Sequence, residues 1–67
     1  MTLILKQNIK SPDDAYSELI AAHEGLSKTE SERLNARLIL ILMNQIGELA
    51  TIREALTAAR KNTVERN

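Results

Sequence analysis

Apolar side chains recur every three to four residues over three stretches of the chain, which is the spacing of helices buried on one face. Two glycines separate the stretches, because Gly25 follows the first and Gly47 follows the second. Glycine commonly ends a helix, since it adopts the left-handed backbone conformation without strain. We therefore expect three helices, the second ending at Ile46 and the third running from about Leu49 to Lys61.

Two of the expected helices also carry start signals. Ser11 is a candidate N-cap, and Pro12 follows it at the first helical position, where a missing N–H costs nothing. Ser27 and Glu30 have the spacing of a capping box, in which each side chain binds the backbone N–H of the other residue. The second helix is therefore expected to begin directly after Ser27.

The residues before Ser11 are partly apolar but show no clear period. We expect an extended arm over residues 1–10, a three-helix domain over residues 11–62 and a frayed tail over residues 63–67. The predicted fold class is all-α: a small three-helix domain with an extended N-terminal arm, assembled as a dimer.

The expected second helix is apolar around most of its circumference. Leu38 to Met43 are six consecutive apolar residues, and the polar residues of this helix form one narrow strip. Two short neighbouring helices cover only part of such a surface, so the rest has to meet the arm or another chain. We favour another chain. The residues expected at that interface are Leu38, Ile39, Ile41, Leu42, Met43 and Ile46.

The small size of the chain strengthens this expectation. A domain of 67 residues buries only about 60 % of the surface that its unfolded chain exposes. Disulfides, metals or association commonly compensate in this size range. The sequence has no cysteine and one histidine, His23, so one chain cannot supply the four Cys and His ligands of a structural zinc site. We expect no metal and no cofactor, and stabilisation by helix packing or by a homo-oligomer.

The charge composition argues against nucleic acid as a partner, and the apolar runs argue against a membrane. Nine Lys and Arg balance nine Asp and Glu, and no basic stripe is present. The apolar run is far shorter than the roughly 20 residues that span a bilayer. The opening residues MTLIL are too short for the core of a signal peptide. The expected location is cytoplasmic, which the absence of cysteine also favours.

Five polar side chains are candidates for a functional site: Tyr16, His23, Asn35, Arg37 and Gln45. His23 lies in the apolar arc of the first helix with no nucleophile or orienting carboxylate beside it. A structural role, with the ring bonded to a backbone carbonyl near the turn at Gly25, is therefore favoured over a catalytic one.

Asn35 and Gln45 fall within the apolar arc of the second helix, where a buried amide without a hydrogen bond is costly. They either fix the register of an oligomer or bind backbone within the subunit. Arg37 lies on the polar strip with Arg33, and Glu30 lies one turn before Arg33. This spacing predicts a solvated row of ion pairs.

The segments NIKSPDDAYSELIAAHEGLS and SERLNARLILILMNQIGE resemble a family of small bacterial proteins known only as a domain of unknown function. The likeness extends from about Asn8 to Ala59. The matching positions are Pro12, Asp13, His23, Gly25, Leu26, Ser27, Leu34, Asn35, Ala36, Arg37, Asn44, Ile46 and Gly47. The chain departs at Gln45 and Glu48, where the family has His and Asp, so a role that rests on that histidine does not carry over. The resemblance implies an association with flavin-dependent oxidoreductases and no particular activity.

The sequence therefore predicts a protein that acts through protein–protein interaction, as a homo-oligomer, as an accessory subunit of a bacterial enzyme, or as both. The alternative is a small-ligand-binding protein with a pocket around Tyr16, His23 and Asn35. An independent enzyme is not expected, because the chain has no phosphate-binding glycine loop, metal motif or nucleophile–base pair.

Overall fold

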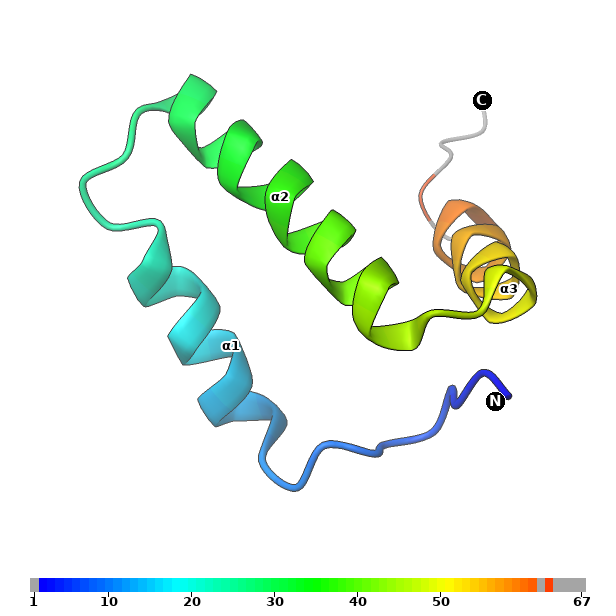
Figure 1. Ribbon diagram of the computed structural model, residues 1–67. Coiled ribbons are helices and arrows are strands. Elements are labelled where there is room, and N and C mark those ends of the chain that lie inside the picture. Colours follow the sequence, from blue (N-terminus) through cyan, green and yellow to red (C-terminus); the bar gives the residue numbers. More distant parts are fainter. Residues whose placement is uncertain (1, 62, 64–67) are drawn as a thin grey trace, which may run out of the picture.

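Three helices contain most of the residues described by the computed structural model, which are residues 2–61 and 63 (Figure 1). They are α1 (Pro12–Ala22), α2 (Lys28–Ile46) and α3 (Leu49–Lys61). Residues 2–10 form neither helix nor strand. The predicted all-α fold with three helices is confirmed. The tail predicted over residues 63–67 lies, apart from Thr63, outside the described residues.

The first helix begins as predicted, but Ser11 does not cap it with its side chain. Ser11 occupies the N-cap position with φ −135°, and its hydroxyl accepts no backbone N–H. Its carbonyl accepts the first helical hydrogen bond from the N–H of Ala15, at 3.1 Å. Proline at the first helical position and two aspartates in the first turn favour the helix start instead.

The first helix ends before Gly25. Its last residue is Ala22, and His23 is the C-cap with a right-handed backbone conformation. Gly25 lies two residues further on with φ +77°, and the N–H of Leu26 closes the turn by donating to the carbonyl of His23 at 3.1 Å. Gly25 therefore shapes the turn toward α2 and is not the residue immediately after the C-cap.

Both ends of the second helix match the sequence signals. The backbone N–H of Glu30 donates to the hydroxyl of Ser27 at 3.2 Å, and the N–H of Ser27 donates to Glu30 Oε1 at 2.9 Å. This is the predicted capping box. At the other end Gly47 has φ +72°, and its N–H donates to the carbonyl of Met43 at 2.9 Å.

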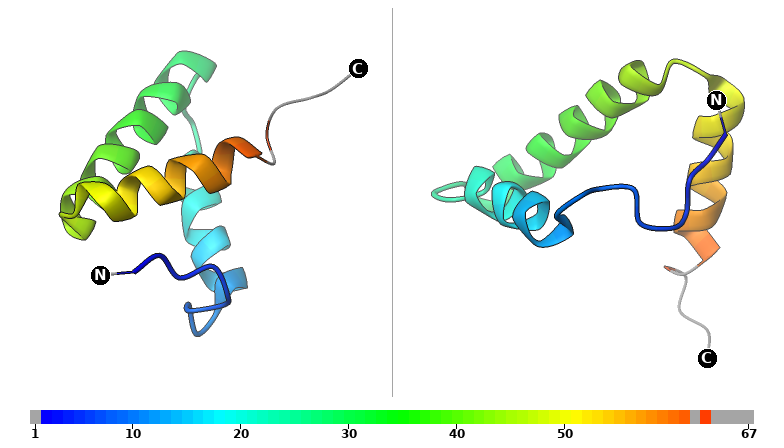
Figure 2. Two further views of the ribbon diagram at one scale, coloured as in Figure 1. Left: turned by 90° about the vertical axis from the view of Figure 1, so that its right-hand side faces the viewer. Right: turned by 90° about the horizontal axis from the view of Figure 1, so that it is seen from below.

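The helices form an open arrangement (Figures 1 and 2). α1 and α2 run antiparallel from the turn at residues 23–27, and no Cα atom of one lies within 8 Å of a Cα atom of the other. α3 lies across the far end of α2. The arm runs from the start of α1 toward α3, where Leu3 and Leu5 line a shallow hollow on that helix. In the described residues the arm therefore lies along α3. The sequence leaves the arm open as the less favoured of two covers for the second helix.

The chain has no apolar core of its own in the described residues. None of their hydrophobic side chains is buried, and the single buried residue is Thr51, at 3 % exposure. The accessible surface is 6405 Å², about 2,200 Å² more than the roughly 4,200 Å² of a compact protein of this mass. The radius of gyration is 13.9 Å, against about 11 Å for a compact domain of this length.

The apolar run of α2 is exposed along four consecutive residues. Ile39, Leu40, Ile41 and Leu42 expose between 51 % and 64 % of their surface. Four successive residues on a helix point in four directions around its axis. Neither α1, α3 nor the arm covers this part of α2.

Candidate interaction surface

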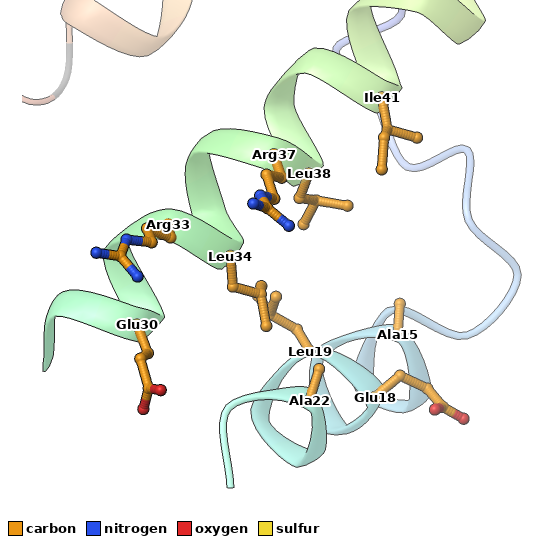
Figure 3. Close-up of a pocket in the computed structure, with 10 residues that line it drawn as sticks. All are labelled: Ala15, Glu18, Leu19, Ala22, Glu30, Arg33, Leu34, Arg37, Leu38 and Ile41. Atoms are coloured by element: carbon orange, nitrogen blue, oxygen red, sulfur yellow. The ribbon is translucent and has the colours of Figure 1, made fainter. Parts of the chain in front are cut away.

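A groove of about 710 Å³ lies between α1 and α2 (Figure 3). It exists because the two helices are joined by side chains near their turn while their backbones stay apart. The groove lining consists of Ala15, Glu18, Leu19, Ala22, Glu30, Arg33, Leu34, Arg37, Leu38 and Ile41.

The floor of the groove is apolar. Leu19 of α1 and Leu34 of α2 point toward each other, and Leu38 and Ile41 continue the floor along α2 (Figure 3). Leu19, Leu34 and Leu38 are half-buried, whereas Ile41 is 64 % exposed. Alanines on α1 leave this floor open, because a methyl group fills little of the space between two helices.

The two edges of the groove carry opposite charges. Glu18 on α1 is acidic, and Arg33 and Arg37 on α2 are basic (Figure 3). All three side chains are exposed. Within the described part of the chain none of them is held in a hydrogen bond or an ion pair, so these charges are open to a partner.

The expected ion pair between Glu30 and Arg33 is not formed among the described residues. The Glu30 carboxylate instead accepts the N–H of Ser27, at 2.9 Å, in the capping box. The Glu30 side chain is thus directed back toward Ser27, and the capping box is the interaction that it forms in the described residues.

His23 connects α1 to α2 through side chains. Its Nε2 lies 3.1 Å from Asn35 Oδ1, and its Nδ1 lies 2.8 Å from Ser31 Oγ. Because the amide oxygen only accepts, Nε2 is the donor in the first bond. In a neutral ring Nδ1 then accepts the hydroxyl of Ser31.

This geometry corrects two expectations and supports a third. His23 is half-buried, but it binds two side chains of α2 where a backbone carbonyl was expected. Asn35 is exposed, although its place in the apolar arc predicted burial. Both ring nitrogens of His23 are used in joining the helices, which supports a structural role for this residue.

The remaining polar candidates do not join His23 and Asn35. Tyr16 is 64 % exposed on α1, and Gln45 is exposed near the end of α2. Neither side chain forms a hydrogen bond within the residues described. Arg37 lies on the edge of the groove. None of Tyr16, His23 and Asn35 lines the groove. The ligand pocket predicted around these three residues stays a prediction.

The residues predicted for an interface lie on several sides of α2. Ile39, Ile41 and Leu42 are exposed, and Leu38, Met43 and Ile46 are half-buried. Leu38 and Ile41 lie in the groove, and the other four lie outside its lining. Sequence reasoning missed the contribution of α1, namely Glu18 and Leu19. The sequence pattern that indicates this contribution is the spacing of Ala15, Leu19 and Ala22, which places them on one face of α1 beside Glu18.

A second polar pair lies at the start of α3. The Thr51 hydroxyl donates to Glu48 Oε1 at 2.6 Å, and this hydrogen bond lowers the pKa of the Glu48 carboxyl from its ordinary value of 4.5. The carbonyl of Glu48 also accepts the N–H of Ile52, at 3.1 Å. Glu48 therefore places a carboxylate at the positive end of α3, where the helix dipole favours it.

Two kinds of site have no counterpart in the described residues. They contain no group of three or more His, Cys, Asp or Glu side chains that could hold a metal ion. No helix in this part of the chain has both the length and the apolar character needed to cross a membrane.

The chain belongs to the family described as protein of unknown function (DUF2783), whose pattern matches residues 3–61. The match includes the arm, the three helices and the groove between α1 and α2. No curated protein and no solved structure matches the chain at a significant level.

Proposed function

We propose that this chain acts through protein–protein interaction, as a subunit whose helices α1 and α2 are covered by another polypeptide. One observation carries the proposal: in the described residues no hydrophobic side chain is buried, and twelve large ones are exposed. Exposed apolar surface on this scale typically marks an interaction site in a folded protein.

The proposal includes two kinds of partner. One is a second copy of the chain, and the other is an enzyme for which this chain is an accessory subunit. A flavin-dependent oxidoreductase is the enzyme class suggested by the family resemblance. The absence of cysteine is consistent with a cytoplasmic assembly.

The energetic reason for a partner is the cost of ordering the chain. Fixing each residue costs about 1–2 kcal/mol in conformational entropy, and burial of apolar surface is the main compensation. A chain whose apolar residues stay exposed lacks that compensation until a partner covers them. Folding and association should therefore be coupled.

Sedimentation equilibrium combined with circular dichroism on the full chain tests the proposal. We expect helical signal only in associated species, and a melting temperature that rises with protein concentration because association stabilises the folded state. A chain that is fully helical while sedimenting as a 7.5 kDa monomer would overturn the proposal. A poorly helical monomer would support it, since such a chain requires a partner to fold.

A further inference from the structure

The strongest unassigned feature of the molecule is the charged apolar groove between α1 and α2. Its floor contains Leu19, Leu34, Leu38 and Ile41. Its α1 edge carries Glu18 and its α2 edge carries Arg33 and Arg37 (Figure 3). Glu30 also lines the α2 edge, at the end nearest the turn, with its carboxylate in the capping box. A face that pairs with this groove needs an apolar strip flanked by a basic edge opposite Glu18 and an acidic edge opposite Arg33 and Arg37. The groove face of the chain itself has this pattern.

Glu18 and Arg37 lie at almost the same level along the two helices. His23 binds both Ser31 and Asn35, so its level on α1 corresponds to a point between these residues on α2. Glu18 precedes His23 by five residues, or about 7.5 Å of helix rise. Arg37 lies about four residues beyond the midpoint of Ser31 and Asn35, or about 6 Å along α2.

We infer that the occupant of the groove is a second copy of this chain, packed groove to groove about a two-fold axis parallel to α1 and α2. This inference rests on the proposed function and names its partner. Such an axis places α1 of each copy against α2 of the other. The rotation does not change the position of any residue along the direction of the axis. Glu18 then faces Arg37 of the second copy, and the reverse pair forms by symmetry.

The charges also favour this arrangement over one with the two-fold axis perpendicular to the helices. An axis perpendicular to the helices would place α2 against α2 and bring the strips with Arg33 and Arg37 together. Like charges facing each other across an interface cost several kcal/mol. The parallel axis avoids this contact and gives a dimeric four-helix bundle with Leu19, Leu34, Leu38 and Ile41 inside.

The chain as a whole exposes enough surface for an interface of ordinary size. A stable interface of ordinary size buries about 800 Å² on each partner. The chain exposes about 2,200 Å² beyond the surface of a compact protein of its mass. One interface of ordinary size therefore uses less than half of this excess.

Charge reversal on the full chain tests the inference by sedimentation equilibrium. The variants are Glu18→Arg, Arg37→Glu, and an equimolar mixture of the two. Each variant alone should raise the dimer dissociation constant about tenfold. In each, like charges face each other at both contacts between α1 of one copy and α2 of the other. The dissociation constant of the mixture should return to within about threefold of the original value. In the heterodimer an acidic residue again faces a basic one at both contacts between α1 and α2.

Glu32→Arg is the matched control, since Glu32 is exposed on α2 and lies outside the groove lining. It makes the same charge change and should leave the dissociation constant within about twofold of the original. If single variants lose their helical signal, recovery of that signal on mixing supports the inference. Absence of recovery overturns it.

Other outcomes separate this inference from the proposed function. A dimer that is insensitive to both reversals overturns the groove-to-groove arrangement and leaves the proposed function intact. A chain that stays a poorly helical monomer overturns the second copy as partner, while an interaction with another protein still stands. A folded monomer overturns both.

Discussion

His23 and Asn35 are joined by a hydrogen bond of 3.1 Å between the ring Nε2 and the amide Oδ1. The bond spans twelve positions in the sequence and connects the end of α1 to the second turn of α2. Together with the 2.8 Å contact between His23 Nδ1 and Ser31 Oγ, it sets the register of the two helices. The level of Glu18 relative to Arg37 follows from that register.

Replacing His23 should therefore weaken the helix pair. His23→Ala removes both side-chain hydrogen bonds, and we expect a loss of about 1–2 kcal/mol in the free energy of unfolding. Asn35→Ala should cost about 0.5–1 kcal/mol, because its bond lies in contact with solvent. Urea unfolding at one protein concentration measures both, and Gln45→Ala is the control with an exposed amide. A double variant whose effects add without coupling would contradict the bond.

The capping box gives a second prediction. Ser27→Ala removes the hydroxyl that accepts the N–H of Glu30, and loss of such a cap typically costs about 1 kcal/mol. Ser17→Ala is the matched control, because Ser17 is exposed within α1 and caps no helix. Thermal unfolding followed by circular dichroism should show a lower midpoint for the first variant alone. Equal midpoints would mean that the cap contributes nothing.

Acidification should weaken the start of α3. Thr51 holds the pKa of Glu48 below its ordinary value of 4.5, so the folded state favours the charged carboxylate. The stability that this charge contributes is present above the ordinary pKa and is lost as the pH falls through the lowered value. An NMR titration of the Glu48 side chain measures the shift directly.

The control for this titration compares two threonines. Thr51→Val removes the donor and should move the pKa of Glu48 back toward 4.5. Thr57→Val removes a hydroxyl that donates to the carbonyl of Arg53, at 3.0 Å, and should leave the pKa of Glu48 unchanged. A Glu48 pKa that is the same in all three proteins would show that the Thr51 hydroxyl does not lower it.

We also expect no appreciable binding to duplex DNA at about 150 mM salt. Affinity for DNA grows with the number of phosphates that clustered Lys and Arg neutralise, and the net charge of this chain is zero. In the inferred dimer Arg37 faces a carboxylate, so symmetry does not enlarge the basic surface. A gel-shift titration with the full chain measures this. A salt-sensitive complex at low micromolar protein would contradict it.

The sequence predicted the helix boundaries of α2 closely because their signals are local. Ser27 and Glu30 bind each other's backbone across three residues, and Gly47 needs only its own positive φ. Ser11 shows the limit of this reasoning. Its backbone angles, φ −135° and ψ 87°, differ from the φ −70° and ψ 169° of Ser27, and its hydroxyl accepts no helix N–H. A candidate cap becomes a cap only when the local dihedral angles permit it.

The site was harder to predict because it depends on how two helices lie against each other. Periodicity places Leu19 and Leu34 on faces of their own helices, but it does not say that these faces meet across an open groove. The same reasoning placed Asn35 among buried residues, whereas the separation of α1 and α2 leaves it exposed beside His23. The exposure of Ile39 to Leu42 could be inferred from the sequence, since two short neighbouring helices cannot surround a helix that is apolar on most sides.

The lack of a buried apolar core in the described residues has a consequence for turnover in the cell. In the described residues two side-chain hydrogen bonds and the half-buried Leu19 and Leu34 join α1 to α2. A helix pair with so few contacts opens at low free-energy cost, and proteases cleave the opened form in proportion to its population. A copy without a partner is therefore expected to be degraded faster than an assembled one. The cellular level of the chain would then follow the level of the assembled complex, with surplus copies removed by proteolysis.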